Sequence, residues 1–341
     1  MTSEQQNNRV GTRNRRTNWL AGVATAIAAL SLFARHWWVA DLFANLRVQL
    51  ILGLMVTMVL LTIIRSWRPV VLMTVVTLWQ ATFLLSAFQN NPNSSLSNQS
   101  IDFRAIGESP PGLRVFLANV LTRNPHHDQI IAQIQAADPD VIVILELSSK
   151  LRDELQTEFS TSHEYRIAEY QDDGNFGIGL WSRYPLTDAR IFHLNSQYLP
   201  SIESDLEFHE QTIHVFATHP LPPVGAKNFQ HRNQHLALLA KRIQERRNAA
   251  PGHPILVLGD LNLTPWSPLF QDFLTITDLQ SAAAGHGLRP TWYRWNLFPF
   301  GLILDHGLYS RDVLCKNRRI LPFNGSDHRA VVFDFLLLPP G

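Results

Sequence analysis

The sequence contains almost no cysteine and almost no net charge. Of its 341 residues, only Cys315 is a cysteine. This excludes both a disulfide within the chain and a cysteine-rich metal site. The 29 Lys and Arg residues nearly balance the 28 Asp and Glu residues, which leaves a formal net charge of +1. The chain therefore lacks the overall positive charge typical of nucleic-acid-binding proteins, although a local basic patch is compatible with this balance.

Long apolar runs are concentrated at the start of the chain. Three runs, 18–34, 48–64 and 69–88, contain no charged residue, and each is close to the ~20 residues that a membrane helix needs. A signal peptide is the alternative for the first run, but no small-residue cleavage site follows it. A buried helical hairpin is a further alternative, but these runs lack the polar face that such helices present. We therefore expect three transmembrane helices.

The arginines predict how these helices are oriented. Four arginines precede the first run, and Arg65 and Arg68 lie between the second and third runs. Because positively charged loops stay on the cytoplasmic side, we expect a cytoplasmic tail at 1–17 and a multi-pass anchor at 18–88 in the cell (inner, cytoplasmic) membrane. Everything after the anchor is then expected on the extracytoplasmic side.

A polar linker and an α/β domain are expected after the anchor. Residues 89–112 are rich in Asn, Ser and Pro, which is typical of a linker. Residues 113–341 are numerous enough for one α/β domain, in which helices cover buried sheets. Strands are expected at 113–120, 140–147, 175–186, 213–220, 255–262, 302–310 and 328–338, and helices at 127–137 and 226–247.

Polar residues stand at or just beyond the ends of most of these apolar strands. A buried carboxylate is costly unless it is paired or binds a metal. One such residue alone is readily explained as a cap or a turn former. Six strands that share the feature, all with residue types common in catalysis, indicate a site built from the loops at the strand ends. The residues are Asn119, Glu146, His219, Asp260, Asn262, Asp305, Asp327 and His328.

The chemistry of these side chains favours hydrolysis of a phosphorus ester. Carboxylate and amide oxygens predict a hard cation, Mg²⁺ with Mn²⁺ or Ca²⁺ as alternatives. His219 and His328 can transfer protons or contact a phosphoryl oxygen, which suits in-line attack of water on phosphorus. Asp260 and Asn262 are two residues apart, so on a strand their side chains would share one face.

The order of these motifs resembles the endonuclease/exonuclease/phosphatase superfamily over residues 113–338. The most specific part is GDLN followed much later by SDH, downstream of a strand that ends in Glu. The resemblance implies a four-layer α/β sandwich with two mixed sheets and a catalytic domain at 113–341. The three apolar runs and the THPLPP segment are similar to the bacterial membrane-anchored branch, which includes vancomycin-resistance-type proteins. The motifs are LANV, VILEL, GIGLWSRYPL, FATHP, VLGDLNLTP, ILDHGLYS and GSDHRAV.

The same resemblance implies a divalent-metal-dependent phosphoric ester hydrolase. It makes Glu146 the main metal ligand, with Asn119 and Asp327 beside it, and Mg²⁺ the expected cofactor, with Mn²⁺ as the alternative.

The resemblance also assigns the catalytic roles. Asp260 orients or deprotonates the attacking water, and Asn262 contacts the scissile phosphate. His328 contacts the phosphate or protonates the leaving group, and Asp305 holds its imidazole. His219 is a second residue that faces the phosphate.

Some further residues admit two interpretations. Ser182 and Arg183 either contact phosphate or form a turn. His231 and Arg232 either face the site or face solvent, and solvent is favoured. His306 is expected to point away from the site. Trp292 and Trp295 either form an apolar wall of the cleft or cover the core. Asn175 is a further candidate for the cleft lining.

Three functions are compatible with these residues. The first is a phosphoesterase acting on a phosphate ester or pyrophosphate, including a lipid-linked one, at the outer membrane surface. The anchor and the near-neutral charge favour it. The second is a membrane-tethered nuclease, with nucleic acid as substrate. The third is a catalytically dead binding domain, which the complete set of site residues disfavours. The expected partners are the lipid bilayer and the phosphorylated substrate, and no protein partner is predicted.

Overall fold

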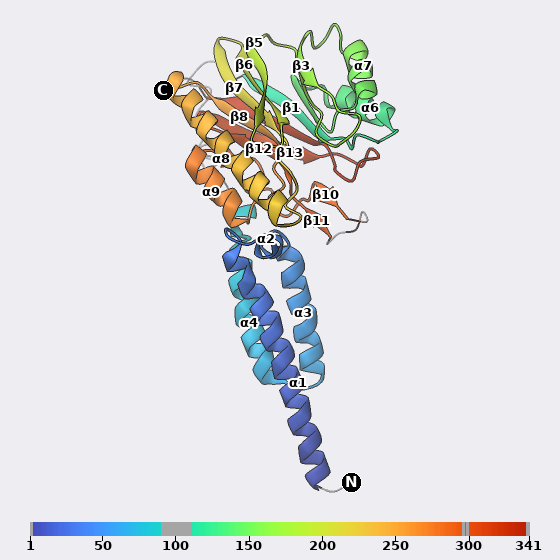
Figure 1. Ribbon diagram of the computed structural model, residues 1–341, viewed down its shortest axis with the longest axis vertical. Helices are drawn as coiled ribbons and strands as arrows, with labels where there is room; N and C mark the ends of the chain where they lie inside the picture. The colour runs from blue at the N-terminus through green and yellow to red at the C-terminus, as the bar shows by residue number, and fades with distance from the viewer. Residues whose placement is uncertain (1–2, 90–110, 295–296, 298–299, 339–341) are drawn as a thin grey trace, which may run out of the picture. The chain divides into compact units, whose positions relative to one another are not determined.

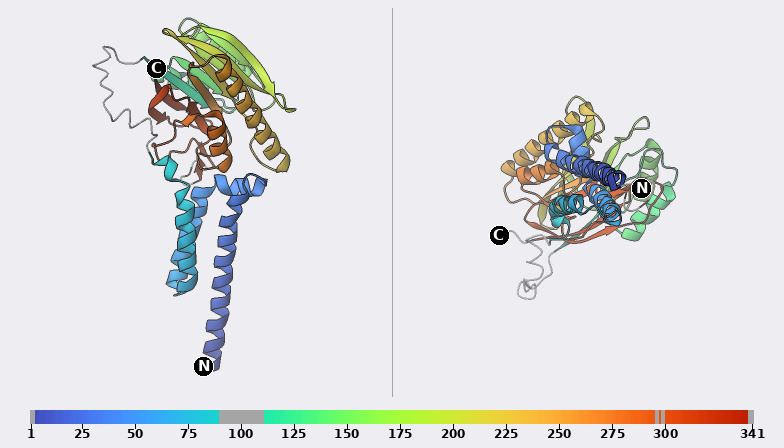
Figure 2. Two further views of the ribbon diagram at one scale, coloured as in Figure 1. Left: turned by 90° about the vertical axis from the view of Figure 1, so that its left-hand side faces the viewer. Right: turned by 90° about the horizontal axis from the view of Figure 1, so that it is seen from below.

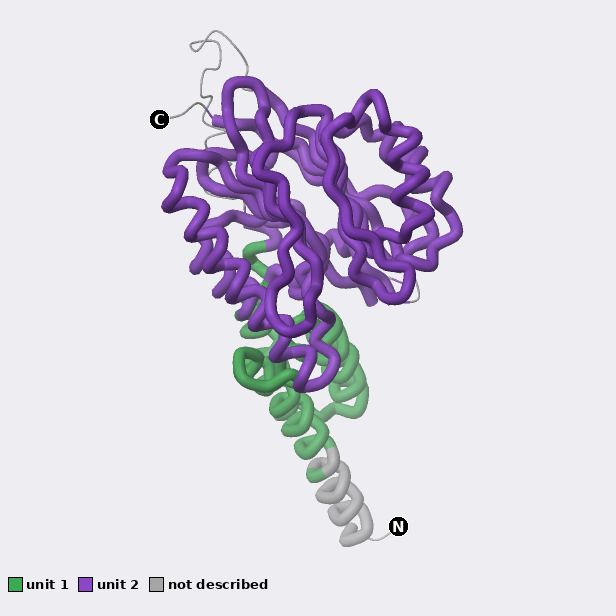
Figure 3. Tube along the Cα trace, turned by 45° about the horizontal axis from the view of Figure 1, so that its top comes forward, with its two compact units in different colours: residues 1–86, 266–268 green, residues 87–265, 269–341 purple. Residues whose placement is uncertain are grey.

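The computed structural model describes residues 3–89, 111–294, 297 and 300–338 (Figure 1). Most of the predicted linker, 90–110, and Trp295 lie outside the described residues. The chain divides into two compact units, residues 1–86 with 266–268, and residues 87–265 with 269–341 (Figure 3). The first unit is mainly helical, and the second contains all the sheets.

The helical unit is built around three helices that lie along one another (Figure 2). They share a small apolar core to which Ala28, Leu54, Leu61 and Met73 contribute. The elements are α1 (Ser3–Leu30), a 3-10 turn (Ser31–Phe33), α2 (Trp38–Asn45), α3 (Arg47–Ile63), α4 (Trp67–Thr82) and a second 3-10 turn (Leu85–Ala87).

These helices do not support the prediction of three transmembrane spans. The third predicted span runs to residue 88, whereas α4 ends at Thr82. At 1.5 Å per residue, the 17 residues of α3 rise about 26 Å, less than the ~30 Å of a bilayer core. Within the described ranges, no single helix combines the length and the apolarity needed to cross a membrane. Thr17–Phe33 and Trp38–Asn45 reach that threshold only as a pair, bent by 105°.

The second unit contains two six-stranded mixed sheets and a two-stranded ribbon. In each six-stranded sheet one neighbouring pair is parallel, β1 with β2 and β7 with β8, and the other pairs are antiparallel. In spatial order, sheet A is β13 (Val313–Ile320), β14 (Val331–Leu337), β1 (Gly112–Asn119), β2 (Val141–Leu145), β4 (Ile178–Ser182) and β3 (Tyr165–Glu169). Sheet B is β5 (Leu186–Leu194), β6 (Leu199–Phe208), β7 (Gln211–Thr218), β8 (Ile255–Asp260), β12 (Asp305–Tyr309) and β9 (Gln280–Ser281). The ribbon is β10 (Trp292–Tyr293) with β11 (Gly301–Leu302).

Helices cover the outer face of each sheet, which confirms a four-layer α/β sandwich. The inner faces of the two sheets share one apolar core, to which Leu117, Val143, Leu258 and Phe333 contribute. The helices α6 (His127–Ala137) and α7 (Ser149–Glu158) pack on the other face of sheet A. The helices α8 (Ala226–Ala249) and α9 (Pro268–Thr277) pack on the other face of sheet B (Figure 1).

The end of strand β8 leaves no room for a side chain at Gly259. A Cβ added there would lie 1.9 Å from the backbone oxygen of Thr218, its partner on β7. We predict that Gly259→Ala destabilises the domain by about 3 kcal/mol, seen as a lower Tm. Gly112→Ala is the matched control, because its Cβ would meet its nearest atom, in Leu336, at 3.7 Å. Equal Tm values for the two variants would contradict this packing.

Candidate active site

The strand ends of both sheets bring the polar residues together at one end of the sandwich. β1 and β2 are parallel, so Asn119 and Glu146 lie at the same edge of sheet A. β7 and β8 are likewise parallel in sheet B and lead into His219 and Asp260. Because β12 runs antiparallel to β8, it begins at this edge, with Asp305 directly opposite Asp260.

At the centre of the site lies His328, between two buried carboxylates. Its Nδ1 is 2.8 Å from Asp305 Oδ2, and its Nε2 is 3.5 Å from Asp260 Oδ2. Burial alone would lower the pKa of His328, but the two carboxylates outweigh it and raise the pKa to about 10. Burial raises the pKa of Asp260 to about 7. Burial also acts to raise the pKa of Asp305, but the charge and hydrogen bond of His328 leave it lowered.

The second histidine, His219, is buried on the other side of Asp260. Its Nε2 is 3.6 Å from Asp260 Oδ2, and its ring packs against Phe176 with 5.1 Å between the ring centroids. Burial, and then the nearby charge of His328, lower the pKa of His219 to about 3. His219 is therefore neutral at pH 7, whereas His328 is cationic.

Glu146 supplies a carboxylate oxygen that no described residue satisfies. The residue is buried, and its Oε2 has no hydrogen-bond partner among the described residues. Burial raises the pKa of Glu146, opposed by Asn119 and His328, and the charge of Asp327 raises it further. The backbone of Glu146 has a positive φ of 59°, and the backbone carbonyl oxygen of Glu146 accepts a hydrogen bond of 3.1 Å from Thr122 Oγ1. A buried carboxylate oxygen without a partner is a natural place for a cation.

Asn119 and the 326–328 loop connect these groups across the site. Asn119 Nδ2 donates to Asp260 Oδ2 over 3.3 Å, and Ser326 Oγ donates to the Asn119 backbone oxygen over 2.8 Å. Trp292 Nε1 donates to Asp327 Oδ2 over 2.8 Å. Of the two interpretations of Trp292, this contact favours the one that places it at the site.

The segment after β8 is a turn as well as part of the site, which corrects the expectation that Asp260 and Asn262 share a strand face. The strand ends at Asp260, and Asn262 has a φ of 51°. Asn262 N donates to Asp260 Oδ1 over 2.9 Å, as in an Asx turn, and Asn262 Nδ2 donates to the Pro220 oxygen over 2.9 Å. Because the strand has ended and Asn262 is left-handed, the two-residue alternation of a strand does not extend to this stretch.

Arg232 was assigned to solvent from the sequence, and that prediction is wrong. Its side chain is fully buried, and Nη1 donates to the backbone oxygen of Asn262 over 3.0 Å. The helical pattern carries a signal, because Arg232 lies four residues before Leu236 and seven before Leu239 on the buried face of α8.

Ser182, Arg183 and His306 form contacts outside the site. Ser182 Oγ accepts a bond from the Tyr184 amide, and Arg183 pairs with Asp138, so the turn interpretation holds for both. His306 points away from the site, as expected, and its Nε2 lies 2.8 Å from the Leu263 backbone oxygen.

The donor groups fit a divalent cation. Ligand atoms of Asp260, Asp305 and His328 all lie within 4.8 Å of one another. However, His328 and Asp305 are already hydrogen-bonded to each other, and a hard cation prefers oxygen. The free oxygen of Glu146, with Asn119 and Asp327 beside it, is the better fit.

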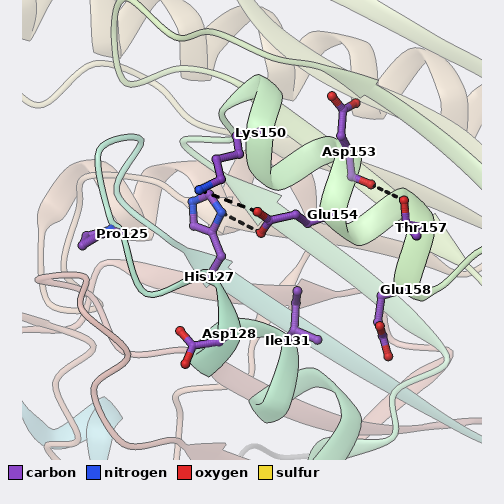
Figure 4. Close-up of a pocket in the computed structure, with 9 residues that line it drawn as sticks. All are labelled: Pro125, His127, Asp128, Ile131, Lys150, Asp153, Glu154, Thr157 and Glu158. Atoms are coloured by element: carbon purple, nitrogen blue, oxygen red, sulfur yellow. Dashed lines mark hydrogen bonds and ion pairs between the residues drawn. The ribbon is translucent and has the colours of Figure 1, made fainter.

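A pocket of about 660 Å³ between α6 and α7 lies outside this set (Figure 4). Its acidic lining is partly paired, because Glu154 contacts His127 at 2.8 Å and Lys150 at 3.9 Å. None of the predicted site residues lines it.

Several solved structures share this fold. Truncated TDP2 of Caenorhabditis elegans has a TM-score of 0.54 at 15% identity, over 66% of this chain and 98% of that one. The human Nocturnin catalytic domain with bound sulfate has 0.53 at 20%, over 67% and 95%. The Neisseria 3′ phosphatase NExo bound to a product DNA hairpin has 0.56 at 18%, over 65% and 99%. Among curated proteins no sequence match is found.

The sequence profile of the Endonuclease/Exonuclease/phosphatase family matches residues 113–328, which span β1 to the central histidine of the site. This is well over half of the chain, and it contains every residue described above as part of the site. The chain therefore belongs to the Endonuclease/Exonuclease/phosphatase family, and it is a phosphoric ester hydrolase.

Proposed function

We propose that this protein is a divalent-metal-dependent phosphoesterase that hydrolyses a phosphate ester or pyrophosphate on the outer face of a membrane. The observation that carries the proposal is the position of His328 between the buried carboxylates of Asp305 and Asp260. Such an array can hold a water, accept its proton and supply another proton to a leaving group.

In the proposed reaction Asp260 holds the attacking water and accepts its proton. A pKa raised to about 7 suits this task, because the protonated and ionised forms of Asp260 are then similarly populated near pH 7. As the oxygen–phosphorus bond to water forms, the bond to the leaving oxygen breaks, and His328 gives that oxygen a proton. Asp305 fixes the imidazole through Nδ1, which leaves Nε2 toward the reacting groups.

The remaining residues bind the phosphate group. His219, neutral and beside Asp260, and Asn262, through the part of its amide not bound to Pro220, are placed to contact phosphoryl oxygens. Glu146, with Asn119 and Asp327, would hold Mg²⁺ or Mn²⁺, which neutralises charge on the phosphate as it is attacked.

Membrane attachment is the second part of the proposal, and exposed apolar surface supports it. A helical unit in water rarely leaves a continuous apolar surface uncovered. A lipid bilayer would cover it and hold the catalytic domain near lipid-linked phosphates, at the extracytoplasmic side predicted from the arginines. On α3 and α4, residues Val56, Val59, Ile63, Val71, Val75 and Leu78 are each between 60% and 70% exposed.

A nuclease is the second candidate, because TDP2 of D. rerio and NExo of Neisseria, which share the fold, were solved with DNA. The two candidates are separated by assaying the full chain with Mg²⁺ on polyprenyl pyrophosphate, phospholipid, single-stranded DNA and duplex DNA. Activity on DNA alone would reject the lipid substrate. A domain that only binds would hydrolyse none of them.

We predict that Asp260→Asn and His328→Ala each lower kcat by roughly 100- to 10,000-fold, because each removes an acid–base group. His193→Ala is the matched control, since this histidine lies on β5 and pairs with Glu169. Initial rates on the best substrate of the panel provide the measurement. Near-full activity in either site variant would show that the site is wrongly assigned.

We predict that Glu146→Gln weakens Mn²⁺ binding at least about tenfold, because the amide cannot supply the negative charge. Electron paramagnetic resonance of free Mn²⁺ measures the affinity. The control is Glu154→Gln, in the pocket between α6 and α7. If Glu154→Gln weakened binding and Glu146→Gln did not, the metal site would lie in that pocket.

We predict that alkaline phosphatase, a reporter that is active only outside the cytoplasm, is active when it is fused to the C-terminus. The same reporter fused after Ser66, in the arginine-containing connection between α3 and α4, should be inactive, because that connection is expected in the cytoplasm. A C-terminal green fluorescent protein that fluoresces in cells would refute the proposed topology.

A further inference from the structure

The turn that follows β8 has two successive backbone carbonyls held by buried side chains from different elements. The oxygen of Asn262 accepts a bond from Arg232 on α8, and the oxygen of Leu263 lies 2.8 Å from the imidazole of His306 on β12. Turn carbonyls on a surface are usually left to water. Here the Leu263 carbonyl lies in a buried contact and the Asn262 carbonyl in a partly buried one, and each has its own side-chain partner.

Arg232 makes its contact with the turn from a buried position on α8. It is fully buried, with Nη1 3.0 Å from the Asn262 oxygen and Nε donating to Asn233 Oδ1 over 2.9 Å. Its guanidinium carbon lies 5.5 Å from the ring centroid of Phe229. A buried arginine is costly in free energy, so its presence calls for a role that a leucine on the same face of α8 would not fill.

His306 makes the matching contact from the other side. It is 1% exposed, and its ring lies over Phe270 at 4.6 Å between centroids. A donor is required at the Leu263 oxygen, so Nε2 carries the proton. Its neighbour Asp305 points the opposite way, to His328, so β12 contributes one residue to the reacting groups and the next to their support.

The turn needs this support because of what it carries. Asn262 has a φ of 51°, a left-handed conformation that asparagine tolerates but most other non-glycine residues do not. Its amide N–H binds Asp260 Oδ1, and its side chain binds the oxygen of Pro220, next to His219. A rotation of the turn would therefore displace Asp260 and Asn262 together and loosen the segment that carries His219.

We propose that Arg232 and His306 are positioning residues, which clamp the 262–263 backbone so that Asp260 and Asn262 keep their catalytic geometry. Neither residue touches the substrate. The inference rests on the proposed phosphoesterase function of this site.

The test compares Arg232→Met with Arg232→Lys in the full chain. We expect Met to lower kcat about 100-fold, the effect of displacing a catalytic group by about 1 Å, with KM changed less than about twofold. Lys, which keeps a charged donor, should recover part of kcat. Arg242→Met is the matched control on the same helix, because Arg242 binds Glu203 and lies 4.9 Å from the ring of Phe192. It should change Tm but not kcat.

A double-mutant cycle tests whether Arg232 acts through Asp260. If it does, Arg232→Met costs less in the Asp260→Asn background than in the wild-type chain, whereas independent effects would multiply and overturn the proposal. If Arg232→Met does not fold, His306→Phe, which keeps the contact with Phe270 but removes the donor, takes its place, with His306→Gln as the rescue.

Hydrogen exchange gives a readout that needs no activity. The amides of residues 260–264 should exchange faster than in the wild-type chain in Arg232→Met and in His306→Phe. Their exchange rates should be unchanged in Arg242→Met. Unchanged exchange and unchanged kcat in both variants would overturn the inference. If Asp260→Asn lost activity while the Arg232 and His306 variants kept it, the proposed function would stand without the clamp. If the wild-type chain hydrolysed nothing but the variants exchanged faster, the function would be rejected and the clamp would stand.

Discussion

Two carboxylates face each other across neighbouring strands, and the rest of the site depends on how they are neutralised. The β8–β12 register sets Asp305 opposite Asp260, both buried. Two negative charges this close in a low-dielectric interior repel strongly unless a cation stands with them or one of them takes up a proton. His328 is that cation, and it precedes β14 of the other sheet. The charge balance therefore ties the two sheets together at the end where the loops meet.

The backbone around this group is organised to keep it in place. Gly259 lets β7 and β8 approach closely just before Asp260. The turn that follows is held by contacts from α8 and β12, and Ser326 joins the loop of His328 to the end of β1. The reacting side chains come from strand ends and from the loops beside them, and buried contacts to strands and a helix hold those loops in place. Such preorganisation is what acid–base and electrostatic catalysis require.

Much of this arrangement could be read from the sequence, and the failures have physical reasons. Runs such as VIVIL are buried on both faces, so their apolarity marks strands directly, and the helix at 127–137 has clear amphipathic spacing. β5 was missed because it is an edge strand with mostly exposed residues, and α7 because it is short and polar. Asn262 was placed on a strand because no pattern reveals a left-handed residue. Arg232 was placed in solvent because charge is a poor guide to burial where hydrogen bonds and a ring contact receive the guanidinium. The membrane spans were drawn from apolarity, which does not show where a helix ends.

The family and the site agree on phosphoester hydrolysis, and the central claim is that loops of both sheets form one metal and phosphate site. The most direct test is a crystal structure of the full chain with Mn²⁺ and inorganic phosphate, with the manganese located by its anomalous scattering. The account predicts manganese bound to Glu146 and phosphate between it and the Asp260, His219 and His328 side chains. Manganese in the acidic pocket between α6 and α7, with Glu146 left without a metal, would contradict it.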